Sequence, residues 1–580
     1  MKDTKNRPPE RKHLCLVGLI LYFTFVLSCQ TGHLESQSPL DRHQPHNYVG
    51  QKGMVVAAHP LAANAGLAML KKGGNAVDAA IATAFALNAA EPFASGIGGG
   101  GFMVIYLAKK KTVTAINFRE SAPAKAHPEM FIQDGQTNET WRRTHGLAVA
   151  VPGALAGWDL ALSKYGTKSL SEVMQSGIRI AEEGFTASRT FSKINKDEYE
   201  KLIQMAGESN CYLNDGFPFE PGDTFRNPQL ADTFRLIASG GIKEFYQGQL
   251  AKKIIRAVEE HGGIITLEDL ASYKPEEHTP VKGVYKDFTI YSPRLPASGG
   301  LHIIQLLNIL ENWPVTEWKH NSSDYIHYLS EAFRFIFADR DHYLGDPDFI
   351  DIPLQALISK KYARQISAGI NPKHALETYP YGEFDVRDNE KESTTHLCVL
   401  DSEGNVVSLT QTINHFFGSG IIPENTGFLL NNEMDDFSRV VTSPNAPGPK
   451  KRPLSSQGPL IIFKGDRPYL ALGSPGGTRI FTSLFQIIVN TIEFGMSLDE
   501  AIEAPRFFSY STLGKAGDIS LEARVPESVI KSLRELGHVL EVREAYDKYF
   551  GGAQGIMILW DKRLIHGGAD SRRDGHGAGY

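Results

Sequence analysis

The sequence predicts a mixed α/β fold of the α+β type, in which hairpins and helices follow one another along the chain. Apolar and polar residues alternate from His396 to Asp401 and from Val406 to Thr412, and the turn Ser402–Asn405 joins the two runs, as is typical of a β-hairpin. A second hairpin is predicted from Leu460 to Leu472. Helical patterns separated by short loops recur from His145 to about Ile370.

Length, composition and charge limit the class of protein. With 580 residues and 42% apolar content, the chain can bury a large core, and its length alone allows about two to four domains. No internal repeat is evident. The formal net charge of −6 gives no indication of nucleic-acid binding.

The first 29 residues have the features of an export signal. A basic opening precedes the apolar run Leu14–Ser28, which is short for a membrane-spanning helix of about 20 apolar residues and suits a secretory signal. Val26-Leu27-Ser28 before Cys29 also resembles a bacterial lipobox, in which Cys29 is acylated. The alternatives are a simple cleaved signal and an uncleaved anchor. We expect an exported protein, either in the periplasm or lipid-anchored to a bacterial envelope membrane, with a polar linker over residues 30–52.

The four cysteines do not predict a disulfide framework. Removal of Cys15 with the signal and acylation of Cys29 would leave Cys211 and Cys398. Cys398 is expected inside a core strand. Two such residues do not make a disulfide scaffold.

The region from Gly53 to Tyr106 is rich in alanine and glycine. Helices are predicted from Leu61 to Lys71 and from Ala76 to Ala90, the second capped by Asn75. The glycines from Gly96 to Gly101 do not form a phosphate-binding P-loop, because the terminal Lys-Ser/Thr is missing and a strand, not a helix, follows them.

Thr394 is the candidate nucleophile, because it stands at the start of the first hairpin. A threonine hydroxyl needs a base within hydrogen-bond reach, and no His/Asp arrangement of recognisable spacing lies nearby. If the Ser393–Thr394 peptide bond is broken, Thr394 gains an α-amine with a reference pKa of roughly 7.7–8.0, which can act as base for its own hydroxyl. The same hydroxyl can make the cut by attacking the Ser393 carbonyl. The alternative is that these are ordinary edge-strand residues, and the polar segment Asn371–Glu392 before them is expected to be exposed and mobile.

Five motifs after this junction occur in the order found in one known family. They are T-T-H at Thr394–His396, T-x-N at Thr412–Asn414, N-N-E-M-D-D-F at Asn431–Phe437, P-L-S-S at Pro453–Ser456 and G-S-P-G-G at Gly473–Gly477. Two earlier motifs, G-G-N-A-V-D-A-A from Gly73 and G-G-G-G-F from Gly98, belong to the same set. From about Gly53 to Tyr580 the chain resembles the γ-glutamyltransferase (γ-glutamyltranspeptidase, glutathione hydrolase) family of N-terminal-nucleophile hydrolases.

The resemblance implies a fold and a processing event. The expected fold is a four-layer αββα sandwich, with two stacked, mainly antiparallel sheets flanked by helices. One precursor is expected to cut itself into a large subunit, residues 53–393, and a small subunit, residues 394–580, that form one catalytic unit. The implied reaction is γ-glutamyl transfer through an ester on Thr394, from glutathione or other γ-glutamyl compounds to water, an amino acid or a dipeptide. No metal or organic cofactor is required.

The resemblance also implies a binding site for both charged groups of a γ-glutamyl donor. Asn414, Glu433 and Asp436 match positions that hold the α-ammonium, and Arg119, Ser455 and Ser456 match positions that hold the α-carboxylate. A planar guanidinium suits this task because it donates two parallel hydrogen bonds. Without the resemblance, Arg119 is a solvated charge at a strand end, and the acidic motif is a turn after a strand predicted from Gly427 to Leu430.

Two glycines are the expected oxyanion-binding groups. Gly476 and Gly477 lie between the second hairpin and an apolar helix predicted from Ile480 to Phe494, where unobstructed backbone N–H groups meet a positive helix end. They match the oxyanion-hole donors of the family. Thr412 matches the residue that hydrogen-bonds the nucleophile, and lies on the same strand face as Asn414.

One departure from the family pattern affects the substrate range. Only Phe437–Lys450 lies between Asp436 and Lys451, where many relatives have a longer lid loop. An open site predicts that bulkier donors, such as γ-linked polyglutamate or a cephalosporin side chain, can enter. The alternative functions are therefore an acylase for such donors and a non-catalytic exported binding protein.

The histidines are scattered without metal-ligand spacing, so no metal site is predicted (His127, His145, His261, His302, His320, His327, His342).

Overall fold

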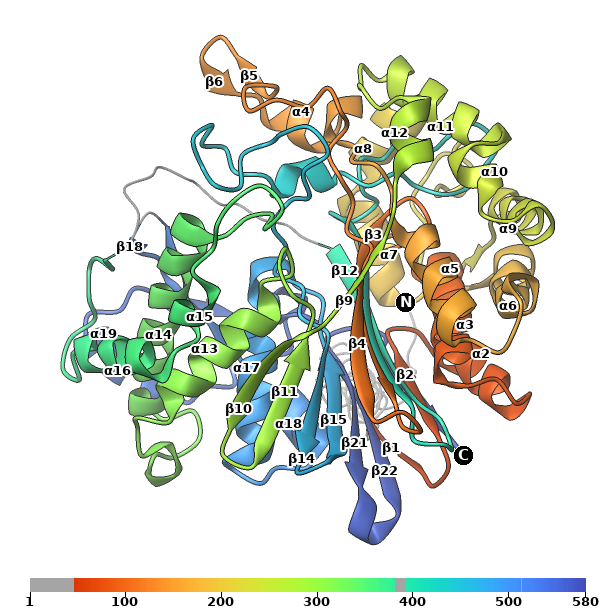
Figure 1. The fold of residues 1–580 in the computed structure, drawn as a ribbon. Coiled ribbons are helices and arrows are strands. Elements are labelled where there is room, and N and C mark those ends of the chain that lie inside the picture. The colour runs from red at the N-terminus through yellow and green to blue at the C-terminus, as the bar shows by residue number, and fades with distance from the viewer. Residues whose placement is uncertain (1–45, 381–392, 513) are drawn as a thin grey trace, which may run out of the picture. The chain divides into compact units, whose positions relative to one another are not determined.

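The computed structural model describes residues 46–380, 393–512 and 514–580 (Figure 1). The predicted signal, Cys29 and most of the predicted linker lie outside these residues. Strand β1, Asn47–Gly50, pairs with β22, Leu564–Ala569, so the predicted linker is wrong at its end, where the chain already belongs to a sheet. In the described residues, no helix has the length and apolar character needed to cross a membrane.

Two seven-stranded sheets form the centre of the fold, and all neighbouring strands in both are antiparallel. The first sheet has the order β1, β22, β21 (Gln554–Leu559), β15 (Arg467–Gly473), β14 (Leu460–Lys464), β11 (Phe288–Ser292) and β10 (Val281–Tyr285). The second has the order β23 (His576–Gly579), β2 (Met54–Ala57), β12 (Ser393–Leu400), β13 (Val406–Asn414), β3 (Gly100–Leu107), β4 (Thr112–Asn117) and β9 (Glu276–His278).

Helices cover the outer face of each sheet (Figure 1). The apolar core outside the second sheet is shared with α2 (Pro60–Lys71), α3 (Ala76–Ala90), α5 (Ala154–Tyr165), α6 (Leu170–Glu183), α9 (Pro228–Gly240) and α11 (Gln249–Glu260). The core outside the first is shared with α13 (Gly299–Leu310), α14 (Ser323–Tyr343), α16 (Lys360–Gly369), α17 (Ile480–Ile492), α18 (Leu498–Glu503) and α19 (Glu527–Glu535). A third apolar cluster lies between the sheets. The predicted four-layer αββα architecture is confirmed.

The central hairpin shows how strand alternation builds these layers. In β12, Leu397 and Val399 join the core under the helices, whereas Cys398 and Leu400 join the core between the sheets. Successive side chains of a strand point to opposite faces, so one strand serves two cores. Thr394 is separated from Cys398 by an even number of positions in β12, so it belongs to the same face of the strand, the one that meets the first sheet. The thiols of Cys211 and Cys398 are both free.

Most predicted elements are present, but one strand is not. Residues 427–430, predicted as a strand, have no regular secondary structure and no sheet pairing. Their main-chain groups bind loops instead: the Gly427 carbonyl accepts from Tyr212 and Asn227 at 2.8 and 2.7 Å, and Leu430 exchanges bonds with residues 419 and 421. The segment is therefore a buried connection to the acidic motif.

Candidate active site

Thr394 lies at an irregularity of the central hairpin. Ser393 pairs with Asn414 and Thr395 pairs with Gln411, so the register shifts across Thr394 and β13 contributes one extra residue. Such bulges re-aim side chains and are common beside active sites. The Thr394 side chain is buried, and its Oγ1 lies 3.3 Å from Oγ1 of Thr412.

The end of β13 turns back on Thr412. Asn414 has a φ of +71°, a left-handed conformation that asparagine tolerates, and its backbone N–H donates to Thr412 Oγ1 at 2.8 Å. The Asn414 side chain donates to the Asn432 carbonyl at 3.1 Å. The structure thus places Asn414 between the candidate nucleophile and the segment that carries Glu433.

The predicted oxyanion loop approaches β12 from the first sheet. Gly473 packs so closely that a Cβ there would lie 2.3 Å from the His396 ring. Gly476 and Gly477 have φ values of +127° and +59°, and within the described residues neither backbone N–H donates a hydrogen bond. These N–H groups precede the short helix η5, Gly477–Arg479, and α17. This arrangement suits the stabilisation of an oxyanion.

His396 does not act as the base for Thr394. Its Nδ1 contacts Thr410 Oγ1 at 2.9 Å and its Nε2 contacts Cys398 Sγ at 3.2 Å, so both ring nitrogens are engaged. Burial lowers the pKa of His396 to about 3, which keeps the ring neutral. A structural role, under the glycine loop, follows from these contacts.

Arg119 forms a buried ion cluster with the acidic motif. Its guanidinium pairs with Glu433 and with Asp436, from the short helix η4, Glu433–Asp436. Glu120 lies 3.7 Å from Arg119 Nη1. The Arg119 side chain is fully buried, so the solvated-charge alternative is wrong. The residues predicted for the two ends of a substrate therefore meet in one cluster.

The acids of this cluster have spare hydrogen-bonding capacity. Among the described residues, Oε2 of Glu433 and both carboxylate oxygens of Glu120 are buried without a hydrogen-bond partner. Burial raises the pKa of Glu120 to about 7 and raises that of Glu433 well above its usual value, although the charge of Arg119 opposes both shifts. A cationic donor entering the cluster would satisfy these acceptors and favour their charged forms.

The two predicted serines lie on the segment that Arg119 holds. Arg119 donates from Nε to the Pro453 carbonyl at 3.2 Å and from Nη2 to the Leu454 carbonyl at 3.3 Å. Ser455 Oγ accepts from the Gln457 N–H at 3.2 Å, and Ser456 Oγ accepts from Arg340 at 3.3 Å. Ser455 and Ser456 thus follow directly after the two residues whose carbonyls Arg119 binds.

Asp435, next to Asp436, has a different environment. It accepts from Arg142 and Arg143 of helix α4, Glu139–Arg143, at 2.8 and 3.0 Å, and contacts His415 Nε2 at 2.9 Å. Burial opposes its ionisation, but His415 and Arg142 together hold the pKa of Asp435 far below its usual range. Asp435 therefore fixes the acidic motif to α4 and to the end of β13.

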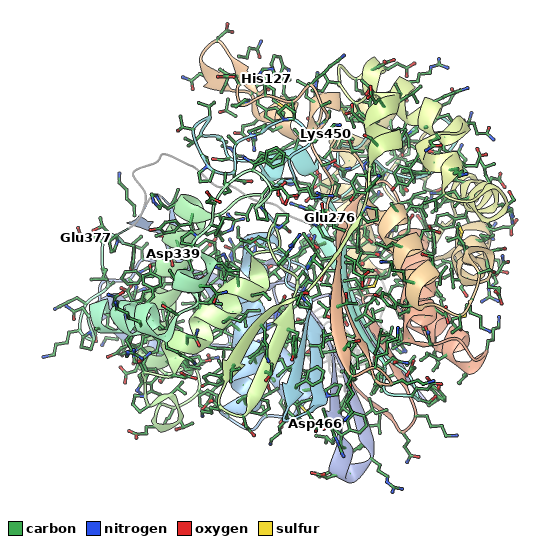
Figure 2. The ribbon with its side chains drawn as sticks, viewed as in Figure 1. His127, Glu276, Asp339, Glu377, Lys450 and Asp466 are labelled. Atoms are coloured by element: carbon green, nitrogen blue, oxygen red, sulfur yellow. The ribbon has the colours of Figure 1, made fainter. Side chains whose placement is uncertain are left out.

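The short connection from residue 437 to residue 450 folds back on the acidic motif and on Leu454. Asn445 donates to the Asp436 carbonyl at 2.7 Å and accepts from the Leu454 N–H at 3.0 Å. Arg452, just after Lys450, donates to Glu276 at 2.6 Å, and Figure 2 labels Lys450 and Glu276. The connection is held down beside Asp436.

Two residues that lie beside Thr394 and Thr395 in the structure cannot be identified from local sequence patterns. Arg573 donates to the Thr394 carbonyl at 2.7 Å across 179 positions of sequence, and Glu91 lies 3.4 Å from the same guanidinium nitrogen. Neither residue belongs to a motif with a recognisable spacing. The sheet brings Arg573 close, because β2 pairs both with β12 and with β23, which follows Arg573 in the chain.

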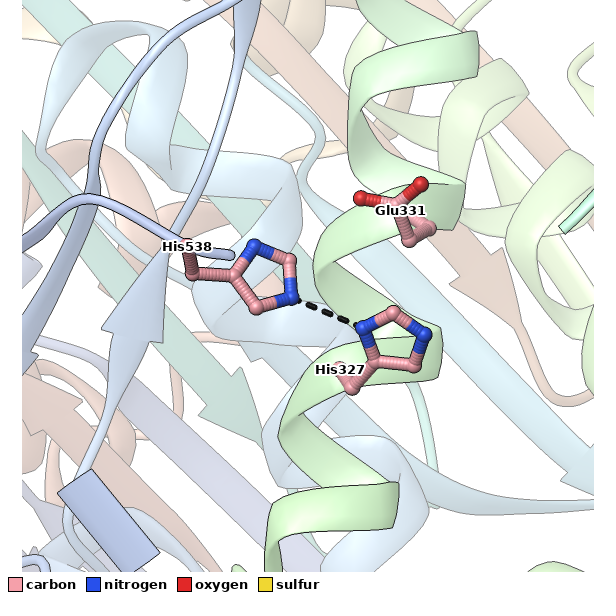
Figure 3. Close-up of side chains that lie close together, drawn as sticks. All are labelled: His327, Glu331 and His538. Atoms are coloured by element: carbon pink, nitrogen blue, oxygen red, sulfur yellow. Dashed lines mark hydrogen bonds between the residues drawn. The ribbon is translucent and has the colours of Figure 1, made fainter. Parts of the chain in front are cut away.

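A second buried cluster joins two histidines that the sequence pattern leaves apart. His327 and Glu331 lie on α14 and meet His538, and the ligand atoms lie within 4.8 Å of one another (Figure 3). His327 Nδ1 and His538 Nε2 are 2.7 Å apart. His327 Nε2 contacts the Asn371 carbonyl at 2.8 Å, and Arg334 Nη1 lies 3.3 Å from His538 Nδ1.

These contacts fit a chain of neutral histidines better than a metal site. If Arg334 donates to His538 Nδ1, then His538 donates to His327, and His327 donates to the Asn371 carbonyl. A metal on His538 Nε2 would require a proton on Nδ1, facing the Arg334 donor. Both Glu331 oxygens are also occupied, by Arg334, Tyr379 and the Leu376 N–H.

The cluster holds the chain that leads to the predicted cleavage junction. Besides Asn371, Leu376 and Tyr379 contact its members, and Ala375 N–H donates to the Leu536 carbonyl at 2.8 Å. Residues 371–380 are mostly exposed, as predicted, but are bound to the small-subunit region at several points. Residues 381–392 lie outside the described part of the chain.

Acidification is expected to weaken the fold through His538. Burial, with help from Arg334 and His327, lowers the pKa of His538 to about 3. The unfolded chain has a His pKa of about 6.5, so it takes up a proton first, and stability falls as pH drops below 6.5. Between pH 7 and pH 5 this histidine should cost about 2 kcal/mol, measured by denaturant unfolding of the uncut Thr394→Ala chain.

Matched variants isolate this effect. His538→Asn should flatten the loss of stability between pH 7 and pH 5, whereas His127→Asn, at an exposed histidine, should leave it unchanged. Equal slopes for wild type and His538→Asn would contradict the assignment.

The chain resembles known proteins over most of its length. Residues 62–580 match the gamma-glutamyltranspeptidase family. The glutathione hydrolase proenzyme of Escherichia coli (strain K12) is 39% identical over 548 residues, which cover 92% of this chain and 93% of that protein. The acylase ACY 1 proenzyme of Pseudomonas sp. (strain SE83) is 39% identical over 533 residues, covering 91% and 93%.

A solved structure supports the same relationship. The cephalosporin acylase from Bacillus halodurans superposes with a TM-score of 0.82 at 30% identity, over 92% of this chain and 97% of that one. The match of residues 62–580 and the identity to full-length relatives confirm the predicted resemblance. The chain belongs to the gamma-glutamyltranspeptidase family.

Proposed function

We propose that the chain is a self-processing γ-glutamyltransferase with glutathione hydrolase activity. The observation that carries this is the position of the Thr394 hydroxyl, 3.3 Å from that of Thr412 at the end of the central hairpin that also carries Asn414. Asn414 connects this point to the motif that pairs with Arg119. A nucleophile beside a buried cation and acids suits a zwitterionic acyl donor.

Processing frees the base that Thr394 needs. The Thr394 hydroxyl adds to the Ser393 carbonyl carbon, the C–N bond breaks, and the acyl group moves from nitrogen to oxygen. Water then hydrolyses the Ser393 ester, leaving a carboxylate on Ser393 and a free amine and hydroxyl on Thr394. Both pieces stay in one sheet, because β12 pairs with β2 and β13 pairs with β3.

Substrate binding uses the charges of the Arg119 cluster. The α-ammonium of the donor is placed against Asp436, Glu433 and the Asn414 side chain, and its α-carboxylate against Arg119, Ser455 and Ser456. The unpartnered Glu433 oxygen supports this placement, because an ammonium would give it a donor.

Acyl transfer then takes two steps. The Thr394 hydroxyl attacks the γ-amide carbonyl while the α-amine takes its proton and passes it to the leaving amine. The N–H groups of Gly476 and Gly477 stabilise the oxyanion. Water, an amino acid or a dipeptide then attacks the γ-glutamyl ester and regenerates Thr394.

Export is part of the proposal. The basic and apolar pattern before Cys29 supports an export signal, with acylation of Cys29 as the alternative to simple cleavage. Mass spectrometry of the mature N-terminus distinguishes a lipid-bearing Cys29 from an unmodified end.

A comparison of two donors tests the function. γ-Glutamyl-p-nitroanilide carries both charged groups, whereas glutaryl-p-nitroanilide lacks the α-ammonium. We expect a kcat/KM ratio of roughly 100 or more in favour of the γ-glutamyl donor, because the glutaryl donor leaves buried acids unpaired. Equal turnover of the two donors would reject the γ-glutamyl specificity.

A lidless acylase is the second candidate. The short connection held beside Asp436 by Asn445, and the similarity to two acylases, favour an open site. Competition between γ-linked polyglutamate and glutathione tests this. If only glutathione is ever turned over, the open-site proposal is wrong.

A further inference from the structure

The main chain of the nucleophile is held by a residue from the other end of the small-subunit region. Arg573 Nη1 donates to the Thr394 carbonyl oxygen at 2.7 Å, and the Arg573 side chain is buried. Its stem lies against Gly552, where a Cβ would come within 2.9 Å of Arg573 Cδ. The preceding Gly551 is the residue that a Cβ on Gly476 would meet, at 3.2 Å. Arg573 thus lies between Thr394 and the backbone that supports the oxyanion loop.

Glu91 holds the Arg573 guanidinium from the end of helix α3. Its Oε1 is 3.4 Å from Arg573 Nη1, and its side chain is 4% exposed. An acid at the C-terminal end of a helix meets the negative end of the helix dipole. Burial raises the pKa of Glu91 to about 7, although the charge of Arg573 opposes this. Within the described residues, Glu91 Oε2 has no hydrogen-bond partner. The charge of Arg573 is the main favourable influence on an acid in this place.

We propose that Arg573, held by Glu91, is a positioning residue that aims Thr394 for self-cleavage and for acyl transfer. This inference rests on the proposed function. Before the cut, Thr394 is fixed by peptide bonds on both sides. After the cut only the bond to Thr395 remains, so the Arg573 contact limits rotation of the new terminus and keeps the hydroxyl beside Thr412. Small misplacements of a reacting group cost large factors in rate.

The charge of Arg573 also acts on the new α-amine. A cation beside Thr394 disfavours the ammonium form, so more of the amine is neutral and able to accept the hydroxyl proton. The charged groups that act on Arg573 or share its surroundings are Glu91, Asp570, Asp574 and Lys548. Asp574 is engaged by Ser188 and Thr190, and Asp570 by Arg506 and Arg572. Glu91 is the acid in direct contact with the Arg573 guanidinium, and it is the first of the three acids that stabilise its charge.

Three substitutions separate the positioning effect of Arg573 from the effect of its charge. Arg573→Gln removes the charge, Arg573→Lys keeps it without the planar fork, and Glu91→Gln removes the acid in contact with it. Arg534→Gln, at an arginine of α19 with 55% side-chain exposure, is the matched control. For each, the rate at which full-length chain splits, then kcat, KM and the pH profile with γ-glutamyl-p-nitroanilide, are measured on the processed protein.

Arg573→Gln should slow splitting and lower kcat by roughly tenfold or more, with KM within about twofold of wild type. The acidic limb of its kcat–pH profile should move to higher pH, because the amine of Thr394 loses a nearby cation. The acidic limb of Glu91→Gln should move to lower pH. Arg573→Lys should recover part of kcat with the wild-type limb. The control should match wild type in every measurement.

Several outcomes would contradict the positioning role of Arg573. If wild type splits and hydrolyses the anilide and Arg573→Gln does so at the same rate, the positioning role is wrong and the proposed function stands. A rise in KM at constant kcat would also reject it, in favour of a substrate contact. If Arg573→Gln does not fold, an unchanged acidic limb of the kcat profile in Glu91→Gln, together with an unchanged kcat in Arg573→Lys, overturns the proposal. A wild-type chain that never splits rejects the proposed function itself.

Discussion

A Thr394→Ala protein is expected to remain one uncut chain and to release no glutamate from a γ-glutamyl anilide. In the proposed mechanism the hydroxyl both cuts the Ser393–Thr394 bond and later carries the acyl ester, so its removal stops both reactions. We expect a loss of roughly a thousandfold or more in turnover. Mass spectrometry for a fragment that begins at residue 394, together with initial rates, measures both effects.

Two further variants make this test specific. Thr394→Ser keeps a hydroxyl and an α-amine and should still split, more slowly. Ser402→Ala changes a hydroxyl in the exposed turn of the same hairpin and should behave as wild type. A Thr394→Ala chain that still divides at this junction would show that another group makes the cut, and the assignment of the nucleophile would fall.

Local patterns predict most of this fold. The alternation on both sides of residues 402–405 predicts β12 and β13, and the capped run Ala76–Ala90 is α3 with the same bounds. These elements are readable because their periodicity lies within one short stretch of chain. Residues 427–430 have the same apolar character but no sheet, because their main-chain groups are bound by residues 212, 227, 419 and 421.

The site is less readable, because its contacts join distant positions. Arg119 and Glu433 are 314 positions apart, and Arg573 and Thr394 are 179 apart. The family resemblance predicts which residues belong to the pocket, but not that Arg119 pairs directly with the acids. The motif selects Asp436 for the pocket but does not predict a role for Asp435, to which the structure gives different partners.

That difference follows from the short helix η4. Successive residues of a tight helix point in different directions, so Asp435 faces α4 and β13 while Asp436 faces Arg119. The Asp436 side chain is 13% exposed and that of Asp435 is 4% exposed. Asp436 is therefore the acid that a ligand can reach, and Asp435 the acid that fixes the loop.

Asp436→Asn is accordingly expected to raise KM for γ-glutamyl-p-nitroanilide about 100-fold while self-cleavage proceeds normally. The neutral amide keeps the shape of the carboxylate but loses its attraction for the α-ammonium, a change of about 3 kcal/mol for a poorly solvated charge pair. Because Asp436 is proposed to bind the donor away from its reacting carbonyl, kcat should fall much less than kcat/KM. Initial rates over a range of donor concentrations separate the two constants.

Two comparisons make the result decisive. Asp435→Asn removes the partner of Arg142, Arg143 and His415, so it should lower the denaturation midpoint, whereas Asp436→Asn should leave that midpoint close to wild type. The glutaryl donor has no ammonium, so its weak turnover should not fall further in Asp436→Asn. If both donors lose activity equally, Asp436 supports the loop and does not bind the ammonium, and selectivity for γ-glutamyl groups must come from elsewhere in the site.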